Sequence, residues 1–326
     1  MSLLSSEIAK ILIIRLSSIG DIVLTTPVVR CIKQQLPGAA VHFLTKKQFE
    51  PVLKANPYID KLWLYDGNFG GLLPQLRAGH YDFIVDLHGN FRSAYVKLML
   101  GRPYGNFNKL NLRKWLMVNF KWNLLPDVHI VDRYFKAVQK PGVKNDGRGL
   151  DYFISSADEV VPPFPEFIAV VVGGKHNTKI FPASRVAQVI GKLSKPVILL
   201  GGREDRARGE EILGLISKPA FNACGMYSLN QSASLLRQSS AVLTNDTGLM
   251  HIAAAYGKKI VSVWGNTIPA FGMYPYLPGG STASCLAEVA GLSCRPCSKI
   301  GFSECPRKHF RCMTDISVDD IARILE

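Results

Sequence analysis

Short apolar runs alternate with helical segments along nearly the whole chain, and this alternation decides the fold class. In the first half, the apolar runs typical of buried strands are Lys10–Arg15, Ala40–Leu44, Lys61–Leu64 and Phe83–Asp86. Helices are expected at Gly20–Leu36, Lys47–Ala55, Phe91–Leu100 and Val131–Val138. Repeated strand–helix units predict a doubly wound parallel sheet, whose ligands bind at the carboxyl ends of the strands.

The second half repeats the alternation and predicts a second sheet. Its expected strands are Phe167–Val172, Pro196–Leu200, Ala220–Cys224, Ala241–Leu243 and Lys259–Trp264. Its expected helices are Pro182–Leu193, Arg203–Ile216, Leu229–Gln238 and Gly248–Tyr256. The strands lack polar alternation, as expected when helices cover both faces of a sheet.

A proline-rich segment, Val160–Pro165, separates the two halves and is the best linker candidate. A chain of 326 residues is also too long for a typical single core. We therefore predict an N-terminal domain of residues 1–160 and a C-terminal domain of residues 161–326. The last helix, Ser317–Leu325, is a candidate to pack back on the N-terminal domain.

Two polar turns, one in each half, lie between a predicted strand and a predicted helix. The first is Leu16–Asp21 and the second is Thr244–Gly248. A helix start offers free N–H groups and a dipole that favours an anion. Asp21 is either a helix N-cap or a general base at a strand end. The second turn, with His251 about one helical turn later, is either a capped helix or a diphosphate site.

Three further loops follow predicted strands in the same way. Gly173–Lys179 and Gly201–Asp205 carry glycines with charged side chains, and Asp86–Ser93 follows a strand of the first half. One such loop is weak evidence. Five polar loops at carboxyl strand ends indicate an enzyme. None of them carries the G-x-G-x-x-G fingerprint of dinucleotide-binding proteins or a Walker A loop.

The net charge of +14 is concentrated between residues 97 and 148. That segment holds eleven Lys or Arg and three Asp, so it contributes +8, and five aromatic residues lie among the charges (Tyr104, Phe107, Trp115, Phe120 and Trp122). It is either a solvated basic face or a surface for nucleic acid, an anionic membrane or a phosphorylated lipid. No apolar stretch has the length of a membrane span. Met1–Glu7 lacks the basic region of a signal peptide and indicates a cytoplasmic start.

Four segments together resemble the family of the ADP-heptose:lipopolysaccharide heptosyltransferases, glycosyltransferase family 9. They are Ile13–Pro27, Tyr81–Ser93, Lys179–Pro182 and Thr244–Ala255, and the resemblance extends from Lys10 to about Met313. It implies a GT-B fold, in which two Rossmann-like, doubly wound parallel-sheet domains face a central cleft. It also implies inverting transfer of heptose from ADP-heptose to a lipopolysaccharide inner-core acceptor.

The resemblance assigns roles to individual residues. Asp21 matches the general base, and the donor-binding positions are Lys179, Glu204, Asp246, Thr247, Gly248 and His251. The acceptor-binding positions are Ser18, Gly20, His88, Arg92 and Ser93. The chain has Phe181 where tryptophan is common and His88 where glutamine is common, which leaves the donor and acceptor open. The expected partners are the nucleotide sugar, a phosphorylated glycolipid and the cytoplasmic face of the inner membrane, with no required cofactor and no nucleic acid.

The cysteines near the C-terminus leave two interpretations. Cys294, Cys297, Cys305 and Cys312 are either reduced structural thiols or ligands of a structural zinc ion, although only one C-x-x-C pair is present. Three rival functions also remain, and the missing dinucleotide fingerprint disfavours one of them, a nucleotide-sugar epimerase or dehydrogenase. Another is a related transferase that uses a different nucleotide sugar as its donor. A basic, non-catalytic α/β protein would bind anions or membranes without binding a nucleotide sugar.

Overall fold

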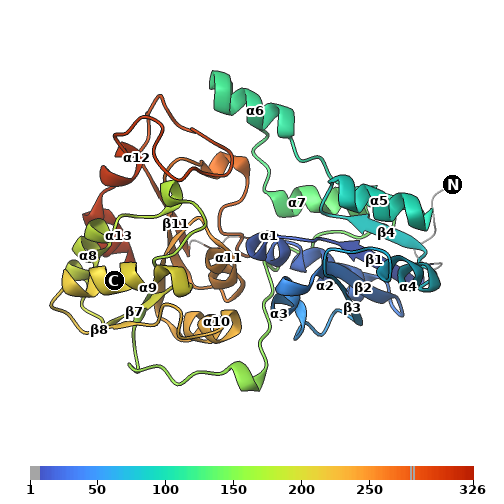
Figure 1. The fold of residues 1–326 in the computed structure, drawn as a ribbon, viewed down its shortest axis with the longest axis horizontal. Coiled ribbons are helices and arrows are strands. Elements are labelled where there is room, and N and C mark those ends of the chain that lie inside the picture. The colour runs from blue at the N-terminus through green and yellow to red at the C-terminus, as the bar shows by residue number, and fades with distance from the viewer. Residues whose placement is uncertain (1–7, 280, 282) are drawn as a thin grey trace. The chain divides into compact units, whose positions relative to one another are not determined.

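The computed structural model describes residues 8–279, 281 and 283–326, and they form two compact units (Figure 1). Unit 1 contains the described residues up to Lys109 together with Val128–Ser155, and unit 2 contains Leu110–Asp127 and Ser156–Glu326. The predicted boundary at residue 160 differs from this division. Glu159 and Val160 bond to side chains of helix α10 (Leu229–Gln238), which ties the start of the proline-rich segment to unit 2. The predicted cytoplasmic start, Met1–Glu7, lies outside the described residues.

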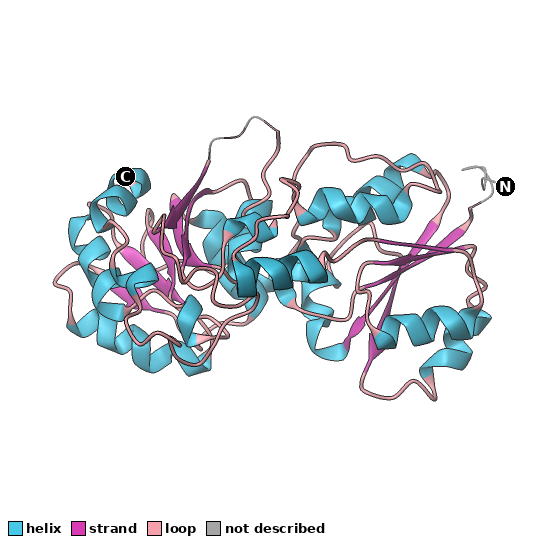
Figure 2. Cartoon of the chain, turned by 90° about the horizontal axis from the view of Figure 1, so that it is seen from above, coloured by secondary structure: helices cyan, strands magenta, loops and turns pink. Residues whose placement is uncertain are grey.

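Unit 1 is built on a five-stranded parallel sheet in the order β3-β2-β1-β4-β5. The strands are β1 (Lys10–Ile14), β2 (Ala40–Lys46), β3 (Lys61–Tyr65), β4 (Phe83–Asp86) and β5 (Tyr104–Asn106). Ile11 to Ile14 of the central strand are fully buried, which explains their uninterrupted apolar run. In Figure 2, helices lie on both sides of these strands, as predicted for a doubly wound sheet.

The expected helix Gly20–Leu36 is two helices, α1 (Ile19–Val23) and α2 (Thr26–Gln35). Thr25 and Thr26 donate their hydroxyls to the carbonyls of Ile22 and Val23 at 2.7 and 2.8 Å. Pro27 has no N–H with which to continue the hydrogen bonds of α1. The helix is therefore interrupted between α1 and α2, where threonine hydroxyls bond to carbonyls of the preceding turn. The remaining helices are α3 (Glu50–Leu53), α4 (Leu72–Ala78), α5 (Phe91–Leu100) and α7 (Ile130–Tyr134), with 3₁₀ turns η2 (Lys47–Phe49) and η3 (Phe135–Val138).

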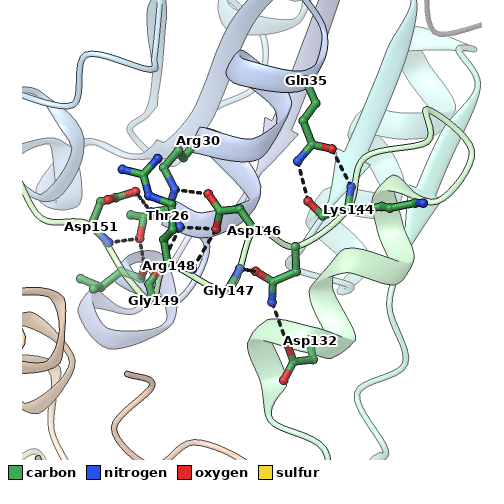
Figure 3. Close-up of polar contacts among 12 residues, drawn as sticks. Thr26, Arg30, Gln35, Asp132, Lys144, Asp146, Gly147, Arg148, Gly149 and Asp151 are labelled. Carbon is green, nitrogen blue, oxygen red and sulfur yellow. Dashed lines mark hydrogen bonds and ion pairs between the residues drawn. The ribbon is translucent and has the colours of Figure 1, made fainter. Parts of the chain in front are cut away.

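A buried arginine joins α2 to the last segment of unit 1 (Figure 3). Arg30 donates through Nε and Nη2 to both oxygens of Asp146 at 2.8 Å, and it also bonds Asp151 and the Gly149 carbonyl. The Asp151 N–H donates to Thr26 Oγ1 at 2.9 Å. A buried guanidinium needs such partners, so residues 146–151 are fixed to α2.

Unit 2 has a six-stranded parallel sheet in the order β11-β10-β9-β6-β7-β8. The strands are β6 (Ile168–Val171), β7 (Val197–Leu200), β8 (Ala220–Asn222), β9 (Ala241–Asn245), β10 (Lys259–Trp264) and β11 (Ser284–Glu288). The α-helices are α6 (Asn111–Phe120), α8 (Ala183–Lys192), α9 (Arg206–Gly214), α10, α11 (Gly248–Ala255), α12 (Arg311–Thr314) and α13 (Val318–Leu325). The 3₁₀ turns are η4 (Ser156–Asp158), η5 (Asn177–Lys179), η6 (Arg203–Asp205) and η7 (Pro269–Phe271).

The last helix, α13, packs against other elements of unit 2. α13 contacts α8, β9 and β10, and its buried residues Ile321, Ala322 and Leu325 join the core cluster of this unit. That apolar face is therefore already covered by the domain from which it emerges. In the part of the chain that the structure describes, none of the helices combines the length and apolar composition of a membrane span.

Candidate active site

Asp21 lies at the first turn of α1, directly beyond the carboxyl end of β1. Its Oδ1 is 2.6 Å from Arg15 Nη2, and its Oδ2 accepts hydrogen bonds from Ser18 Oγ at 2.7 Å and Ser18 N at 3.2 Å. The side chain remains 21% exposed. The carboxylate is thus held in a defined orientation while part of it stays open to a ligand. The N-cap of α1 is Ser18, not Asp21, and Asp21 is the third helical residue, whose carboxylate accepts from the Ser18 N–H in a capping box.

Arg15 organises this turn, although it was not predicted as a site residue. The side chain is buried, and it donates to the carbonyls of Leu87 at 2.5 Å and Ser17 at 2.8 Å as well as to Asp21. Burial opposes its charge, but Tyr134 and Asp21 outweigh that effect and raise the pKa of Arg15. The fixed positive charge stabilises the ionised Asp21 carboxylate. An arginine directly after a buried strand was the available signal.

The turn after β4 lies beside the Arg15 turn because β1 and β4 are parallel neighbours. Asp86 Oδ1 accepts hydrogen bonds from the N–H groups of His88 and Gly89 at 2.9 and 2.8 Å, and Lys97 Nζ lies 2.7 Å from Asp86 Oδ2. His88 is buried, and among the described residues its Nδ1 has no hydrogen-bond partner. Burial, with the charges of Arg15 and Lys109, lowers the pKa of His88 to about 4, so the imidazole is neutral near pH 7.

The other predicted acceptor residues differ in their surroundings. Ser18 and Gly20 share the turn with Asp21. Ser93 is buried, and its hydroxyl and N–H are used in a capping box with Asn90 at the start of α5. Arg92 is exposed on the same helix turn. The structure therefore groups Ser18, Gly20, Asp21 and His88 at one end of the sheet and gives Ser93 a local structural role.

In unit 2, Lys179 and Asp246 form an ion pair. The sequence assigned both to donor binding without predicting that they touch. Thr267, in the loop after β10, donates its hydroxyl to Asp246 Oδ2 at 3.1 Å. Asp246 thus holds the ammonium group of Lys179 at the carboxyl end of β9. Thr267 was not predicted as a site residue, because it lies 21 residues beyond Asp246 and reaches it through the pairing of β9 with β10.

Thr247 and Gly248 begin α11 next to this ion pair. Thr247 is the N-cap, and within the described residues its Oγ1 is buried without a hydrogen-bond partner. A side chain at Gly174 would lie 3.0 Å from Ile180 Cγ1 and 3.8 Å from Thr247 Cγ2, so the glycine loop packs closely against the helix start. His251 is buried one turn into the helix. A helix N-terminus beside a cation favours an anion, so this turn is a candidate anion site.

Glu204 lies in η6, after β7, and its side chain is exposed. The neighbouring Asp205 is buried, accepts a hydrogen bond from the Gly202 N–H at 2.9 Å and pairs with Arg208 at 3.2 Å. Because β9, β6 and β7 are consecutive in the sheet, the three glycine-bearing loops of unit 2 lie at one edge. That edge also carries Lys179, Asp246 and the start of α11.

A family model described as glycosyltransferase family 9 (heptosyltransferase) matches residues 71–301, more than two thirds of the chain. The chain belongs to glycosyltransferase family 9. It is 26% identical to lipooligosaccharide heptosyltransferase 2 of Haemophilus ducreyi, covering 80% of this chain and 85% of that protein.

Solved structures show the same fold. ADP-heptose lps heptosyltransferase II of E. coli aligns with a TM-score of 0.73 at 21% identity, over 97% of each chain. E. coli heptosyltransferase WaaC with ADP-2-deoxy-2-fluoro heptose aligns with a TM-score of 0.66 at 19% identity, over 86% of this chain and 94% of that chain. The two parallel-sheet units of this glycosyltransferase are therefore those of the GT-B fold.

The four C-terminal cysteines of this family 9 glycosyltransferase lie in unit 2, and their role as zinc ligands or structural thiols stays a prediction. All four are free thiols, and the Cys294 Sγ lies 3.7 Å from His309 Nε2. Among residues 8–279, 281 and 283–326, no group of three or more His, Cys, Asp or Glu is arranged to hold a metal ion. Cys312 packs in the core of unit 2, where burial raises the pKa of its thiol to about 12.

Proposed function

We propose that this enzyme transfers a heptose from ADP-heptose to a lipopolysaccharide inner-core acceptor, with inversion at the anomeric carbon. The observation that carries the proposal is the Asp21 carboxylate, oriented by Arg15 and Ser18 and still partly exposed at the end of β1. The family membership and the printed activities of the relatives support the substrate class. The analogue bound in the related WaaC structure supports an ADP-linked donor.

The acceptor step assigns the base to unit 1. Asp21 takes the proton of the acceptor hydroxyl as its oxygen forms a bond to the anomeric carbon. The positive charge of Arg15 favours the ionised form of the carboxylate, which is the form that can accept a proton. The neutral imidazole of His88 adds no positive charge that would compete with Arg15 for Asp21.

The donor step assigns the leaving group to unit 2. The bond between the anomeric carbon and the diphosphate oxygen breaks, and ADP carries away the electron pair. Lys179 and the amides at the start of α11 stabilise the negative charge that develops on the diphosphate. Asp246, fixed by Thr267, keeps Lys179 in place for this role. The transfer needs no further reactant, because Asp21 takes the proton of the acceptor hydroxyl and ADP takes the electron pair of the broken bond.

The test is product analysis with defined donors. The purified protein is incubated with heptose-free lipopolysaccharide and ADP-heptose, with UDP-glucose and GDP-mannose as alternative donors. We expect mass spectrometry to show one added heptose with ADP-heptose only, and NMR of the new linkage to show the opposite anomeric configuration from the donor. Transfer from another donor would replace ADP-heptose in the proposal, and retention would remove the single-base mechanism.

Donor recognition is tested separately by thermal shift with ADP-, GDP- and UDP-linked compounds, because a ligand of the folded state raises the melting point. A basic protein without transferase chemistry would respond to none of them. We place the enzyme at the cytoplasmic face of the inner membrane, where a lipid-linked acceptor is available.

A further inference from the structure

The chain contains a long stretch without a single acidic residue. From Leu87 to Pro126 there is no Asp or Glu, while seven Lys or Arg are present (Arg92, Lys97, Arg102, Lys109, Arg113, Lys114 and Lys121). The second part of this stretch, residues 110–126, leaves unit 1 and belongs to unit 2. We call it the α6 segment. Its charge and its exposed rings together set it apart from an ordinary solvated basic face.

The helix of this segment buries none of its ten residues. Three aromatic rings form an exposed cluster at its end. Trp115 and Phe120 are each 52% exposed, and Trp122 is 60% exposed. The Trp115 and Phe120 ring centroids are 5.5 Å apart, and those of Phe120 and Trp122 are 5.3 Å apart. Leu112 and Leu124 extend the exposed apolar surface on either side.

The α6 segment is attached to unit 2 by its cations. Lys121 Nζ donates to the carbonyls of Pro296 at 2.7 Å and Val118 at 2.8 Å, and Lys114 Nζ lies 5.6 Å from the ring centroid of Phe271. These contacts use the polar ends of the lysines and leave the three rings outside. Contiguous exposed apolar surface of this kind marks an interaction site. Figure 1 shows α6 as a separate teal helix.

We propose that the α6 segment docks on an anionic lipid bilayer, with Trp115, Phe120 and Trp122 at the level of the headgroups. Tryptophan favours this level because its ring is apolar and its N–H is polar. Basic residues beside the rings are attracted to anionic headgroups. A second copy of the same surface would meet an equally positive surface, because the segment has no acid to pair with. The inference rests on the proposed function, since a lipid-linked acceptor lies in such a membrane.

Intrinsic fluorescence reports directly on this surface. The chain has four tryptophans, and Trp63 and Trp264 are buried in the two units. The exposed Trp115 and Trp122 both lie in the α6 segment. We expect vesicles of phosphatidylethanolamine and phosphatidylglycerol in equal parts to shift the emission of the full-length protein to shorter wavelength. Brominated lipids should quench that emission, while phosphatidylcholine vesicles should have little effect.

Matched variants distinguish binding through this surface from non-specific hydrophobic adsorption to vesicles. The ring variant replaces the three exposed rings (Trp115→Ser/Phe120→Ser/Trp122→Ser). It should weaken partition into the anionic vesicles at least tenfold in a flotation assay. Val161→Ser/Leu215→Ser/Met226→Ser, which changes three exposed apolar side chains elsewhere, should leave it unchanged. To test charge, Arg113→Glu should weaken partition several-fold, whereas Arg206→Glu, at an exposed position of α9, should not.

Several results would overturn the proposal. These are equal binding to anionic and neutral vesicles, undiminished binding of the ring variant, or self-association of the wild-type protein that the ring variant abolishes. Tighter binding to a single-stranded oligonucleotide than to vesicles would assign the surface to nucleic acid instead. Vesicle binding needs no turnover, so binding without heptose transfer would contradict the proposed function alone. Transfer to lipid-embedded acceptor that is unaffected in the ring variant would contradict the docking role alone.

Discussion

Arg15 and Asp21 lie on the two sides of the turn after β1, and the guanidinium Nη2 is 2.6 Å from the carboxylate Oδ1. The same guanidinium reaches the Leu87 carbonyl in the turn after β4. One buried arginine thus sets both the orientation of the candidate base and the spacing of the two turns that surround it. A base held in this way needs no rearrangement before it accepts a proton.

Asp21→Asn should reduce turnover by about 10² to 10⁴-fold, because an amide keeps the shape of the carboxylate but is not a base. Donor affinity should stay close to that of the wild type, since the proposed donor groups are in unit 2. Steady-state kinetics with ADP-heptose and calorimetric titration of ADP measure the two quantities separately. Turnover close to the wild-type rate would remove Asp21 from the role of base.

Arg15→Lys tests whether positioning or charge alone matters. A lysine keeps one positive charge, but it lacks the planar fork that reaches Asp21, Leu87 and Ser17 together. We expect kcat to fall roughly 10- to 100-fold at unchanged donor affinity, as expected when a side chain with two or more hydrogen bonds to its surroundings is lost. A melting temperature measured in parallel identifies loss through unfolding. An unchanged kcat would limit Arg15 to a structural role.

Lys179 and Asp246 should behave as a coupled pair in donor binding. Lys179→Ala removes the cation and leaves the Asp246 carboxylate facing the diphosphate, so donor affinity should fall by about two orders of magnitude. Lys179→Ala/Asp246→Asn should bind the donor more tightly than the single Lys179→Ala variant, because the repulsion is gone. Thr267→Val should cost about fivefold, the equivalent of one hydrogen bond. Calorimetric titration gives all three values, and strictly additive effects would contradict the coupling.

The buried strands and the two polar turns were predictable because each is a local pattern. Ile11 to Ile14 form an apolar run that only a covered strand explains, and Asp21 and Asp246 follow such runs directly. Of the edge strands, β3 and β8 were predicted, whereas β5 and β11 were not. β5 has three residues that are half-buried or exposed, and it forms because β4 offers its hydrogen bonds. α6 was missed because no apolar stripe is buried along it.

The partners inside the candidate site were less predictable than its turns. Thr267 reaches Asp246, and Leu87 reaches Arg15, only through the order of strands in each sheet. A single sequence predicts that strands exist, but it does not give their neighbours. The ion pair of Lys179 with Asp246 was hidden for the same reason, since 67 residues separate the two.

His88 should make the stability of the protein depend on pH. Its pKa is about 4 in the folded state, against about 6.5 in an unfolded chain. Between these values the unfolded state binds more protons, so the free energy of unfolding falls as the pH drops from 6.5 towards 4, by up to about 3 kcal/mol. His88→Gln should remove this part of the dependence. Urea denaturation at pH 7.5 and 4.5 measures it, with exposed His80→Asn as control. Equal pH slopes for wild type and His88→Gln would contradict the buried, neutral imidazole.

The Arg30 network should stabilise unit 1 over an acidic pH range. The hydrogen bonds that Arg30 donates to Asp146 lower the pKa of this carboxyl group to about 2, below the value of about 3.9 in an unfolded chain. The stabilisation by Asp146 is therefore fully present above about pH 4 and is lost as the pH falls through 2. Burial raises the pKa of Asp151, so that neighbour contributes to the pH dependence of stability with the opposite sign.

Asp146→Asn should lower the free energy of unfolding at pH 7 by about 1–3 kcal/mol, because Arg30 loses a charged partner. Glu166→Gln, which breaks the exposed pair with Lys195, is the matched control and should change stability little. Equal effects of the two substitutions in urea denaturation at pH 7 would show that the buried position of Arg30 adds nothing to its ion pair.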